Sequence, residues 1–312
     1  MPLSPLHIET PLLRTASDYS ATGLPLWLKL DALQPSGSFK LRGVGLLCQH
    51  AVAKGANEIF CASGGNAGIA AAVAGRALGV PVTIVVPETT SAEVRVRIAA
   101  TGANVRVYGS VFDEANVHAV SLATERKAAY VHPYDHPLLW EGHATLIDEV
   151  VKAGAEFDCV VTSVGGGGLL AGIVEGLRRN GLREIPVIAV ETEGAASLNA
   201  AVVAKERVTL PAITSIANSL GARQVAQHVF DLLAVHPIES VTVTDAQAVA
   251  ACLKFADGYR VLVEPACGAA LAVADVHAGL LSRFKVPLIE VCGGIGVTLA
   301  MLETWRSRFL QE

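Results

Sequence analysis

A lysine directly follows an aromatic residue in a turn that leads into an apolar helix. Residues 35–43 have the sequence PSGSFKLRG, with Phe39 before Lys40, and the chain continues as VGLLCQHAVA. Burial of a lysine amine lowers its pKa and makes it a nucleophile that can form a Schiff base. A lysine in a turn is more commonly a solvated surface charge, so the neighbouring motifs must decide between the two.

A run of four glycines follows one predicted strand and opens a predicted helix. Residues 163–170 read SVGGGGLL after the apolar DCVVT. Backbone N–H groups gathered at a helix N-terminus bind phosphate, and glycines let the backbone approach the anion closely. The segment matches neither GxGxxG nor GxxxxGK[ST], so it favours a small phosphorylated ligand over a dinucleotide or a nucleoside triphosphate. The alternative is a flexible turn.

A second junction of the same kind reads SGGNAG at residues 63–68, after EIFCA. Here Ser63 and Asn66 add a hydroxyl and a carboxamide to the backbone donors, which suits a carboxylate that needs directional hydrogen bonds. Ser or Asn at a helix start is often only an N-cap. Two such junctions in one chain shift the balance toward binding.

A nucleophilic lysine, a phosphate site and a carboxylate site together indicate pyridoxal phosphate as the cofactor. The motifs PSGSFKLRG, SGGNAG, the four glycines, VEPACGAAL and the late CGG resemble those of the fold-type II pyridoxal-phosphate enzymes. Among these, the chain is similar to the L-serine/L-threonine dehydratases, including the liver-type serine dehydratases. The resemblance covers about residues 26–300, with the motifs in the family's order.

This resemblance implies a role for each matching residue. Lys40 would hold the cofactor through a Schiff base and act in catalysis, Phe39 would pack against the pyridine ring, and Asn66 would hydrogen-bond the cofactor's 3′-oxygen. The phosphate would be bound by Gly165, Gly166, Gly167, Gly168 and Leu169. The substrate carboxylate would be bound by Ser63, Gly64, Asn66 and Ala67.

Cys292, in VCGGIG, would lie by the pyridine nitrogen. A buried thiol is a weak hydrogen-bonding partner and is not normally an anion, so it gives little help in keeping that nitrogen protonated. We therefore expect elimination to dominate over transamination.

The family also implies a monovalent cation such as K⁺, held mostly through backbone oxygens at Glu191, Ala195 and Leu220. Glu191 could equally make an ordinary ion pair. Glu264, in VEPACG, is expected to support the cofactor pocket or a helix start rather than to perform acid–base chemistry.

The implied activity is α,β-elimination, which converts serine to pyruvate and ammonia, and threonine to 2-oxobutanoate and ammonia, with Lys40 as the base at Cα. Alternatives are a serine racemase or a cysteine synthase-like β-replacement enzyme of the same fold, and a non-catalytic amino-acid-binding protein. A racemase needs a second acid–base group, which the sequence does not locate. Lys40 in its motif argues against the binding protein.

The chain differs from the family's motifs at two places. Many relatives have Ala or Ser where this chain has Gly64, and a polar pair where it has Ile295-Gly296.

Short β-branched segments alternate with alanine-rich ones along the 312 residues, and 52% of the residues are hydrophobic. This pattern predicts an α/β fold with parallel sheets. The resemblance implies two open, twisted, mostly parallel sheets flanked by helices, the tryptophan synthase beta-like fold. The predicted strands are residues 26–30, 58–62, 82–86, 104–107, 159–162, 187–190, 241–243 and 288–291. The predicted helices are residues 39–52, 67–78, 91–100, 112–126, 141–152, 169–180, 245–255, 265–278 and 297–309.

Two segments rich in turn formers, QPSGS at 34–38 and HPYDHP at 132–137, suggest a nested domain arrangement. We predict a small domain of residues 35–137 inserted into a large cofactor-binding domain of residues 1–34 and 138–312.

Charge and cysteine usage narrow the partners. The net charge is −5 with no basic block, which argues against nucleic acid. The charge-free stretches are too short and interrupted to span a membrane, and the start lacks a secretory signal pattern. Six cysteines without a CxxC pair suggest neither a disulfide frame nor a zinc site. We expect a cytoplasmic enzyme with a small amino-acid substrate and, by resemblance, a homodimer.

Overall fold

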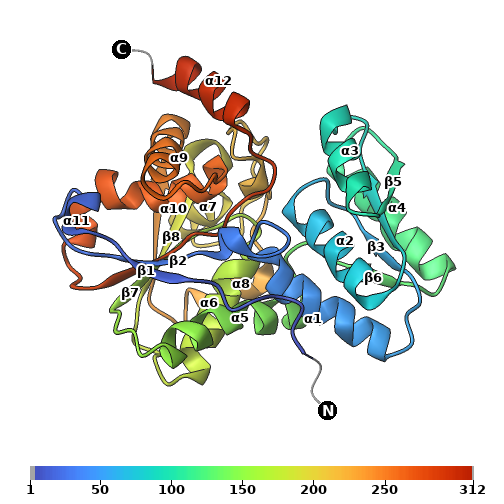
Figure 1. The fold of residues 1–312 in the computed structure, drawn as a ribbon, viewed down its shortest axis with the longest axis horizontal. Helices are drawn as coiled ribbons and strands as arrows, with labels where there is room; N and C mark the ends of the chain where they lie inside the picture. Colours follow the sequence, from blue (N-terminus) through green and yellow to red (C-terminus); the bar gives the residue numbers. More distant parts are fainter. Residues whose placement is uncertain (1–3, 311–312) are drawn as a thin grey trace. The chain divides into compact units, whose positions relative to one another are not determined.

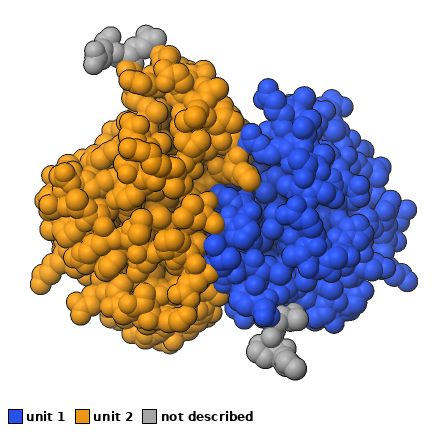
Figure 2. All heavy atoms as spheres, in the orientation of Figure 1, with its two compact units in different colours: residues 1–8, 34–142 blue, residues 9–33, 143–312 orange. Residues whose placement is uncertain are grey.

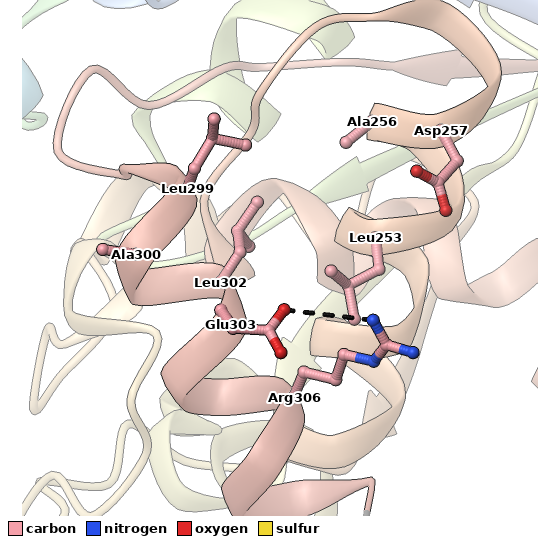
Figure 3. Close-up of a pocket in the computed structure, with 8 residues that line it drawn as sticks. All are labelled: Leu253, Ala256, Asp257, Leu299, Ala300, Leu302, Glu303 and Arg306. Atoms are coloured by element: carbon pink, nitrogen blue, oxygen red, sulfur yellow. Dashed lines mark ion pairs between the residues drawn. The ribbon is translucent and has the colours of Figure 1, made fainter.

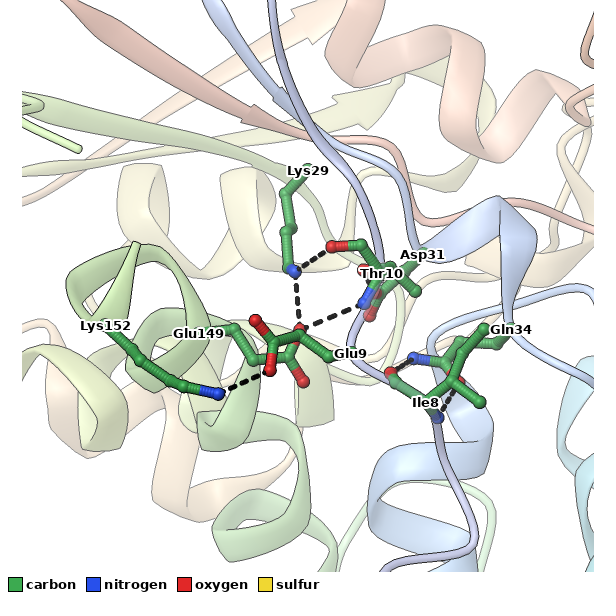
Figure 4. Close-up of polar contacts among 8 residues, drawn as sticks. All are labelled: Ile8, Glu9, Thr10, Lys29, Asp31, Gln34, Glu149 and Lys152. Atoms are coloured by element: carbon green, nitrogen blue, oxygen red, sulfur yellow. Dashed lines mark hydrogen bonds and ion pairs between the residues drawn. The ribbon is translucent and has the colours of Figure 1, made fainter. Parts of the chain in front are cut away.

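The computed structural model describes residues 4–310, which form two compact units coloured separately in Figure 2. The smaller unit contains residues 4–8 and 34–142, and the larger contains residues 9–33 and 143–310. The predicted divisions lay after residues 34 and 137, so the observed ones differ by a few residues, and segment 4–8 joins the smaller unit. The Ile8 N–H donates to Gln34 Oε1 (3.0 Å), and Gln34 Nε2 donates to Ile8 O (2.9 Å) (Figure 4). Gln49 Nε2 donates to Ser4 O (2.7 Å), which fastens this segment further.

The smaller unit is built on a four-stranded parallel sheet, of which β3, β5 and β6 are labelled in Figure 1. Its strands, in spatial order, are β5 (Asn104–Val107), β4 (Val82–Val86), β3 (Ile59–Cys61) and β6 (Ala129–Val131). Its helices are α1 (Lys40–Ala53), α2 (Asn66–Leu78), α3 (Ala92–Ala100) and α4 (Phe112–Glu125). The helix α5 (Pro137–Lys152) begins in this unit and continues into the larger one.

The two faces of this sheet pack against different helices because side chains alternate along each strand. Phe60 and Val85 belong to a buried cluster that includes alanines of α4. On the other face, a Cβ added to Gly75 of α2 would lie 2.1 Å from Val82 Cγ2, and one added to Gly68 would lie 3.3 Å from Ile84 Cγ2. Glycines of α2 therefore allow that helix to approach the sheet closely.

The larger unit contains a six-stranded sheet in which only the edge strand β1 is antiparallel to its neighbour among the described strands. The spatial order is β1 (Leu12–Arg14), β2 (Trp27–Lys29), β10 (Pro287–Glu290), β7 (Cys159–Ser163), β8 (Val187–Thr192) and β9 (Ile238–Val243). The α-helices wholly in this unit are α6 (Gly168–Arg179), α7 (Ser197–Ala204), α8 (Gln227–Leu232), α9 (Asp245–Tyr259), α10 (Pro265–Val276), α11 (Ala278–Leu281) and α12 (Leu299–Phe309). The 3₁₀-helices are η1 (Ser17–Tyr19), η2 (Asp31–Leu33), η3 (Glu193–Ala195) and η4 (Asn218–Leu220).

The core of the larger unit is the centre of this sheet. Every residue of β10, β7 and β8 is buried, as expected for parallel strands covered on both faces. The helix α10, whose sequence is PACGAALAVADV, packs against these strands and is itself buried over most of its length. The mostly parallel, two-sheet α/β architecture predicted from the sequence is confirmed.

A buried ion pair anchors the first strands of the larger unit to α5 (Figure 4). The Lys29 side chain, only 1% exposed, donates to Glu149 Oε2 at 2.5 Å and to Thr10 O at 2.7 Å. Thr10 in turn donates through its hydroxyl to Asp31 Oδ1 (2.7 Å) and through its N–H to Glu149 Oε2 (3.3 Å). The hydrogen bonds satisfy charges that would otherwise be costly to bury.

Helices in the described part of the chain are too short or too polar to cross a lipid bilayer.

Candidate active site

The smaller unit holds Lys40 at the first position of α1, immediately after Phe39. Lys40 is half-buried, its Nζ donates to the Pro133 carbonyl oxygen at 2.7 Å, and it lies 4.9 Å from the centroid of the Phe39 ring. Two residues earlier in the chain, the fully buried Ser38 hydroxyl finds no hydrogen-bond partner among residues 4–310. The Lys40 amine is therefore not a solvated surface charge, and the same segment carries an unsatisfied hydroxyl, which suits a polar ligand.

The surroundings of Lys40 include groups that carry no charge at neutral pH. Burial raises the pKa of Cys61 to about 12, an effect that the positive charge of Lys40 only partly opposes. Burial also lowers the pKa of His132; Asp135 opposes this change, and the positive charges of Lys40 and His136 add to it. The Lys40 amine therefore lies among buried groups that are neutral at this pH.

The segment expected to bind a carboxylate joins the end of β3 to α2. The Gly65 N–H donates to Ser63 Oγ (3.3 Å), and Asn66, the first residue of α2, is 8% exposed. A Cβ on Gly68 would lie 1.9 Å from Ser63 O, so only glycine allows this tight turn. Ala67 is buried beside Asn66. Ser63, Gly64, Asn66 and Ala67 therefore lie at a helix N-terminus, and their binding of the substrate carboxylate remains a prediction.

The four-glycine segment lies in the larger unit, between the end of β7 and the start of α6. Gly167 adopts φ +92°, ψ 0° as the N-cap of α6, and a Cβ there would lie 2.6 Å from Val229 Cγ2. A Cβ on Gly165 would lie 3.0 Å from both Leu220 Cα and Ser219 O. The first N–H groups of a helix have no intrahelical acceptor, so the bare backbone here forms a cradle that side chains would fill. Gly166, Gly168 and Leu169 are buried in the same segment. These features fit the phosphate of pyridoxal phosphate.

Cys292 follows β10, and β10 pairs directly with β7, so Cys292 and the four-glycine segment lie at the same edge of the sheet. The Cys292 thiol is buried, and its neighbours include Cys267 of α10 and Ser163 at the end of β7. Interaction with Cys267, burial and the charge of Glu264 hold the pKa of Cys292 well above its ordinary value, and Ser163 opposes this rise. The thiol is therefore neutral, the state expected for a partner of an unprotonated pyridine nitrogen.

Glu264 lies beside the glycines that follow Cys292. A Cβ on Gly294, which has φ +128°, would lie 2.3 Å from Glu264 Cγ and Cδ. The Glu264 carbonyl accepts the N–H groups of Cys267 and Gly268 at 2.9 Å each, so the residue also supports the start of α10.

The proposed cation ligands Glu191, Ala195 and Leu220 remain a prediction. Glu191 is fully buried and both of its carboxylate oxygens accept backbone N–H groups, from Leu198 (2.8 Å) and Asn199 (2.7 Å), at the start of α7. Within residues 4–310, no cluster of three or more His, Cys, Asp or Glu side chains could hold a metal. A cation site formed mainly by backbone oxygens does not require such a cluster of side chains.

A cavity of about 600 Å³ between α9 and α12 is not this site (Figure 3). It contains neither a lysine nor a glycine-rich segment, and its one ion pair joins Arg306 to Glu303 at 3.9 Å. It is lined by Leu253, Ala256, Asp257, Leu299, Ala300, Leu302, Glu303 and Arg306.

Sequence reasoning missed three contributors: the Pro133 carbonyl, His132 and Cys267. The first is a backbone atom in a segment interpreted only as a turn, and no side-chain pattern marks it. His132 lies in the HPYDHP segment, whose two histidines in a turn could have indicated a functional role. Cys267 stood in VEPACGAAL, but its contact with Cys292 depends on strand order.

Comparisons with known proteins show the family to which the whole chain is related. The sequence model of the family described as "Pyridoxal-phosphate dependent enzyme" matches residues 3–293. The chain is 45% identical to the human protein named "Serine dehydratase-like", over 98% of this chain and 96% of that protein. It is 44% identical to human "L-serine dehydratase/L-threonine deaminase", over 97% of this chain and 96% of the relative. A crystal structure of a fungal L-serine ammonia-lyase from Rhizomucor miehei superposes with a TM-score of 0.89 at 34% identity, covering 98% of this chain and 100% of the other.

Proposed function

Because this chain belongs to the family of pyridoxal-phosphate dependent enzymes, we propose that it is an L-serine/L-threonine dehydratase. It eliminates ammonia from serine to give pyruvate and from threonine to give 2-oxobutanoate. The observation that carries this proposal is the 44% identity, over nearly the whole length of both chains, to a relative named for these two substrates. The fungal L-serine ammonia-lyase structure supports the same reaction class.

Each group that the cofactor needs has a matching partner in the chain. The backbone N–H groups of Gly165 to Gly168 would hold its phosphate, Lys40 would hold its aldehyde end, and the neutral thiol of Cys292 would face its ring nitrogen. Once bound, pyridoxal phosphate supplies the electron sink that makes the Cα proton acidic.

The protein orients the substrate and moves the proton. Ser63, Asn66 and the backbone N–H groups at the start of α2 fix the substrate carboxylate by hydrogen bonds. The amine of Lys40 takes up the Cα proton as a general base, and the bond from Cβ to the hydroxyl breaks with its electron pair on oxygen, so that one proton and the hydroxyl are lost together as water. The enamine that remains then takes up water and releases ammonia, which leaves the 2-oxo acid. A neutral Cys292 thiol would not hold the cofactor's ring nitrogen protonated, so the ring would stabilise negative charge at Cα only weakly. This favours immediate loss of the β-hydroxyl.

The test is a panel of amino acids with separate detection of 2-oxo acids and ammonia. We expect serine and threonine to yield equal amounts of 2-oxo acid and ammonia. D-serine formation without pyruvate would identify a racemase instead, and cysteine formation on addition of sulfide would identify a β-replacement enzyme. A protein that binds amino acids but yields no product in any of these assays would be a non-catalytic binding protein.

We also propose a cytoplasmic homodimer that binds a monovalent cation. Resemblance to the dehydratases supports the dimer and the cation. The six cysteines, all free and buried, suit a reducing compartment. Light scattering on the purified protein tests the dimer, and replacing K⁺ by a bulky organic cation tests the cation.

A further inference from the structure

The turn between β6 and α5 presents a backbone carbonyl to the Lys40 amine. Lys40 Nζ donates to Pro133 O at 2.7 Å, and Pro133 itself is buried. A carbonyl cannot be reoriented by a side-chain rotation. The direction in which it holds the amine is therefore set by whatever fixes the backbone of the turn.

His132 fixes that backbone. Its Nδ1 accepts the N–H of Asp135 at 2.9 Å and the N–H of Tyr134 at 3.3 Å, so the side chain spans the peptide groups on both sides of Tyr134. An imidazole nitrogen that accepts carries no proton. Burial lowers the pKa of His132, which keeps the ring neutral and able to accept both bonds.

The ring of His132 is itself held in place. Tyr134 meets it edge-on with centroids 4.7 Å apart, and Tyr130 does so at 6.4 Å. The Tyr134 carbonyl accepts a hydrogen bond from Trp140 Nε1 at 3.2 Å, which ties the turn to α5. The turn is thus restrained through the histidine ring, through its own N–H groups and through its carbonyl.

We infer that His132 is a positioning residue for Lys40, acting through the Pro133 carbonyl; this inference rests on the proposed function. When the amine is free, one N–H donated to Pro133 O leaves its lone pair with a defined direction. A general base must point that lone pair at the proton it removes. A displacement of about 1 Å in such an arrangement costs on the order of 100-fold in rate.

Two substitutions separate the hydrogen bonds of His132 from its ring contacts. His132→Phe keeps a ring between the two tyrosines but removes the acceptor. His132→Asn removes the ring but supplies an oxygen that can accept the same N–H groups, as in an Asx turn. The matched control is His136→Ala, because His136 Nδ1 also accepts a backbone N–H in this segment, that of Leu138 at 3.1 Å, without holding Pro133.

Two readouts are needed, one of them independent of turnover. The first is the rate of Schiff-base formation when pyridoxal phosphate is added to the full-length, cofactor-free protein. The second is kcat and KM for serine. We expect His132→Phe to lower the first rate about 10-fold and kcat about 10- to 100-fold, with KM changed less than about twofold. His132→Asn and His136→Ala should stay within about threefold of the unaltered protein in all of these.

Wild-type rates in His132→Phe, or equal losses in His132→Phe and either of the other variants, would overturn the inference. If His132→Phe does not fold, as judged by circular dichroism, slow Schiff-base formation in a folded His132→Asn would overturn it, and a normal rate would support it. Failure of the proposed function is recognised separately. The unaltered protein would then form the Schiff base without yielding a 2-oxo acid, and the first readout would still report on His132.

Discussion

Replacing Gly167 by alanine tests the proposed phosphate site at a sterically constrained position. Gly167 has φ +92°, where an L-residue costs roughly 1–2 kcal/mol. The added Cβ would lie 2.6 Å, 2.8 Å and 3.0 Å from Cγ2, Cγ1 and Cβ of Val229. Contact distances between carbon atoms are about 3.5–4.0 Å, so the glycine segment or Val229 must move by about 1 Å.

Such a movement withdraws backbone N–H groups from the phosphate. Each hydrogen bond to a charged group contributes about 1.5–3 kcal/mol, so weakening one of them lowers affinity for pyridoxal phosphate roughly 10- to 100-fold. The change in KM for serine should be smaller, because other residues are proposed to bind the substrate carboxylate. The assay is a titration of cofactor-free protein with pyridoxal phosphate, followed by absorbance, with thermal unfolding of the same samples.

Two further variants separate backbone strain from displacement of the segment. Gly181, just beyond the other end of α6, has φ +75° but no atom within 4 Å of an added Cβ, so Gly181→Ala introduces strain alone. It should lower the unfolding temperature without changing cofactor affinity. Adding Val229→Ala to Gly167→Ala removes the closest contacts and should restore part of the affinity. Unchanged affinity in Gly167→Ala, or an equal loss in Gly181→Ala, would refute the reasoning.

Three other changes have defined outcomes. Gly64→Ala places a methyl group 3.3 Å from Thr90 Cγ2 and stiffens the segment expected to bind the substrate carboxylate. We therefore expect kcat/KM for serine to rise up to about 10-fold while the affinity for pyridoxal phosphate stays unchanged. A change in cofactor affinity alone would contradict this. Burial raises the pKa of Glu191 from 4.5 to about 7. The protonated carboxyl therefore contributes about 3 kcal/mol to the unfolding free energy below pH 4.5, and this contribution should be lost as the pH rises through 7. Urea unfolding between pH 4 and 8 should show this loss, and Glu191→Gln should reduce the dependence of the unfolding free energy on pH. The same pH dependence in both proteins would contradict a raised pKa for Glu191. Glu149→Leu leaves the Lys29 charge buried and should lower the unfolding free energy by about 3–5 kcal/mol in urea titrations, whereas a loss below about 1 kcal/mol would show that the pair is unimportant.

The parts of the fold that the sequence predicted well are those marked by local chemistry. The strands β4 and β5 begin and end where predicted, because β-branched residues alternate sharply with polar turns there. The glycine segments before α2 and α6 lie at helix N-termini for the reason given by the sequence, namely the need for close backbone approach. The predicted fold class follows from the same alternation.

Elements without a local signal were missed. The strands β1 and β6 have only three residues each and lie at sheet edges, where few side chains need to be apolar. The helices α7 and α8, of eight and six residues, are too short for a helical periodicity to stand out. Lys29 was placed in a strand, but its complete burial depends on Glu149, which is 120 residues away in the sequence.

The site residues divide in the same way. Lys40, Asn66 and the four glycines could be predicted because their chemistry resides in residue type and spacing. The neutral state of Cys292 was expected from its burial, but the influence of Cys267 on its pKa and the contact between Lys40 and Pro133 could not be predicted, because both arise from segments that meet only in the folded chain. Groups that act on a site residue from a distant segment of the chain can be identified only in the folded structure.

The most direct measurement is borohydride reduction of the cofactor-loaded protein followed by peptide mapping. Reduction converts a Schiff base to a stable secondary amine and so marks the lysine that held the cofactor. The pyridoxyl label should be found on the peptide containing Lys40 and be absent in Lys40→Ala. A label on another residue, or no label on a protein saturated with pyridoxal phosphate, would contradict the proposed chemistry.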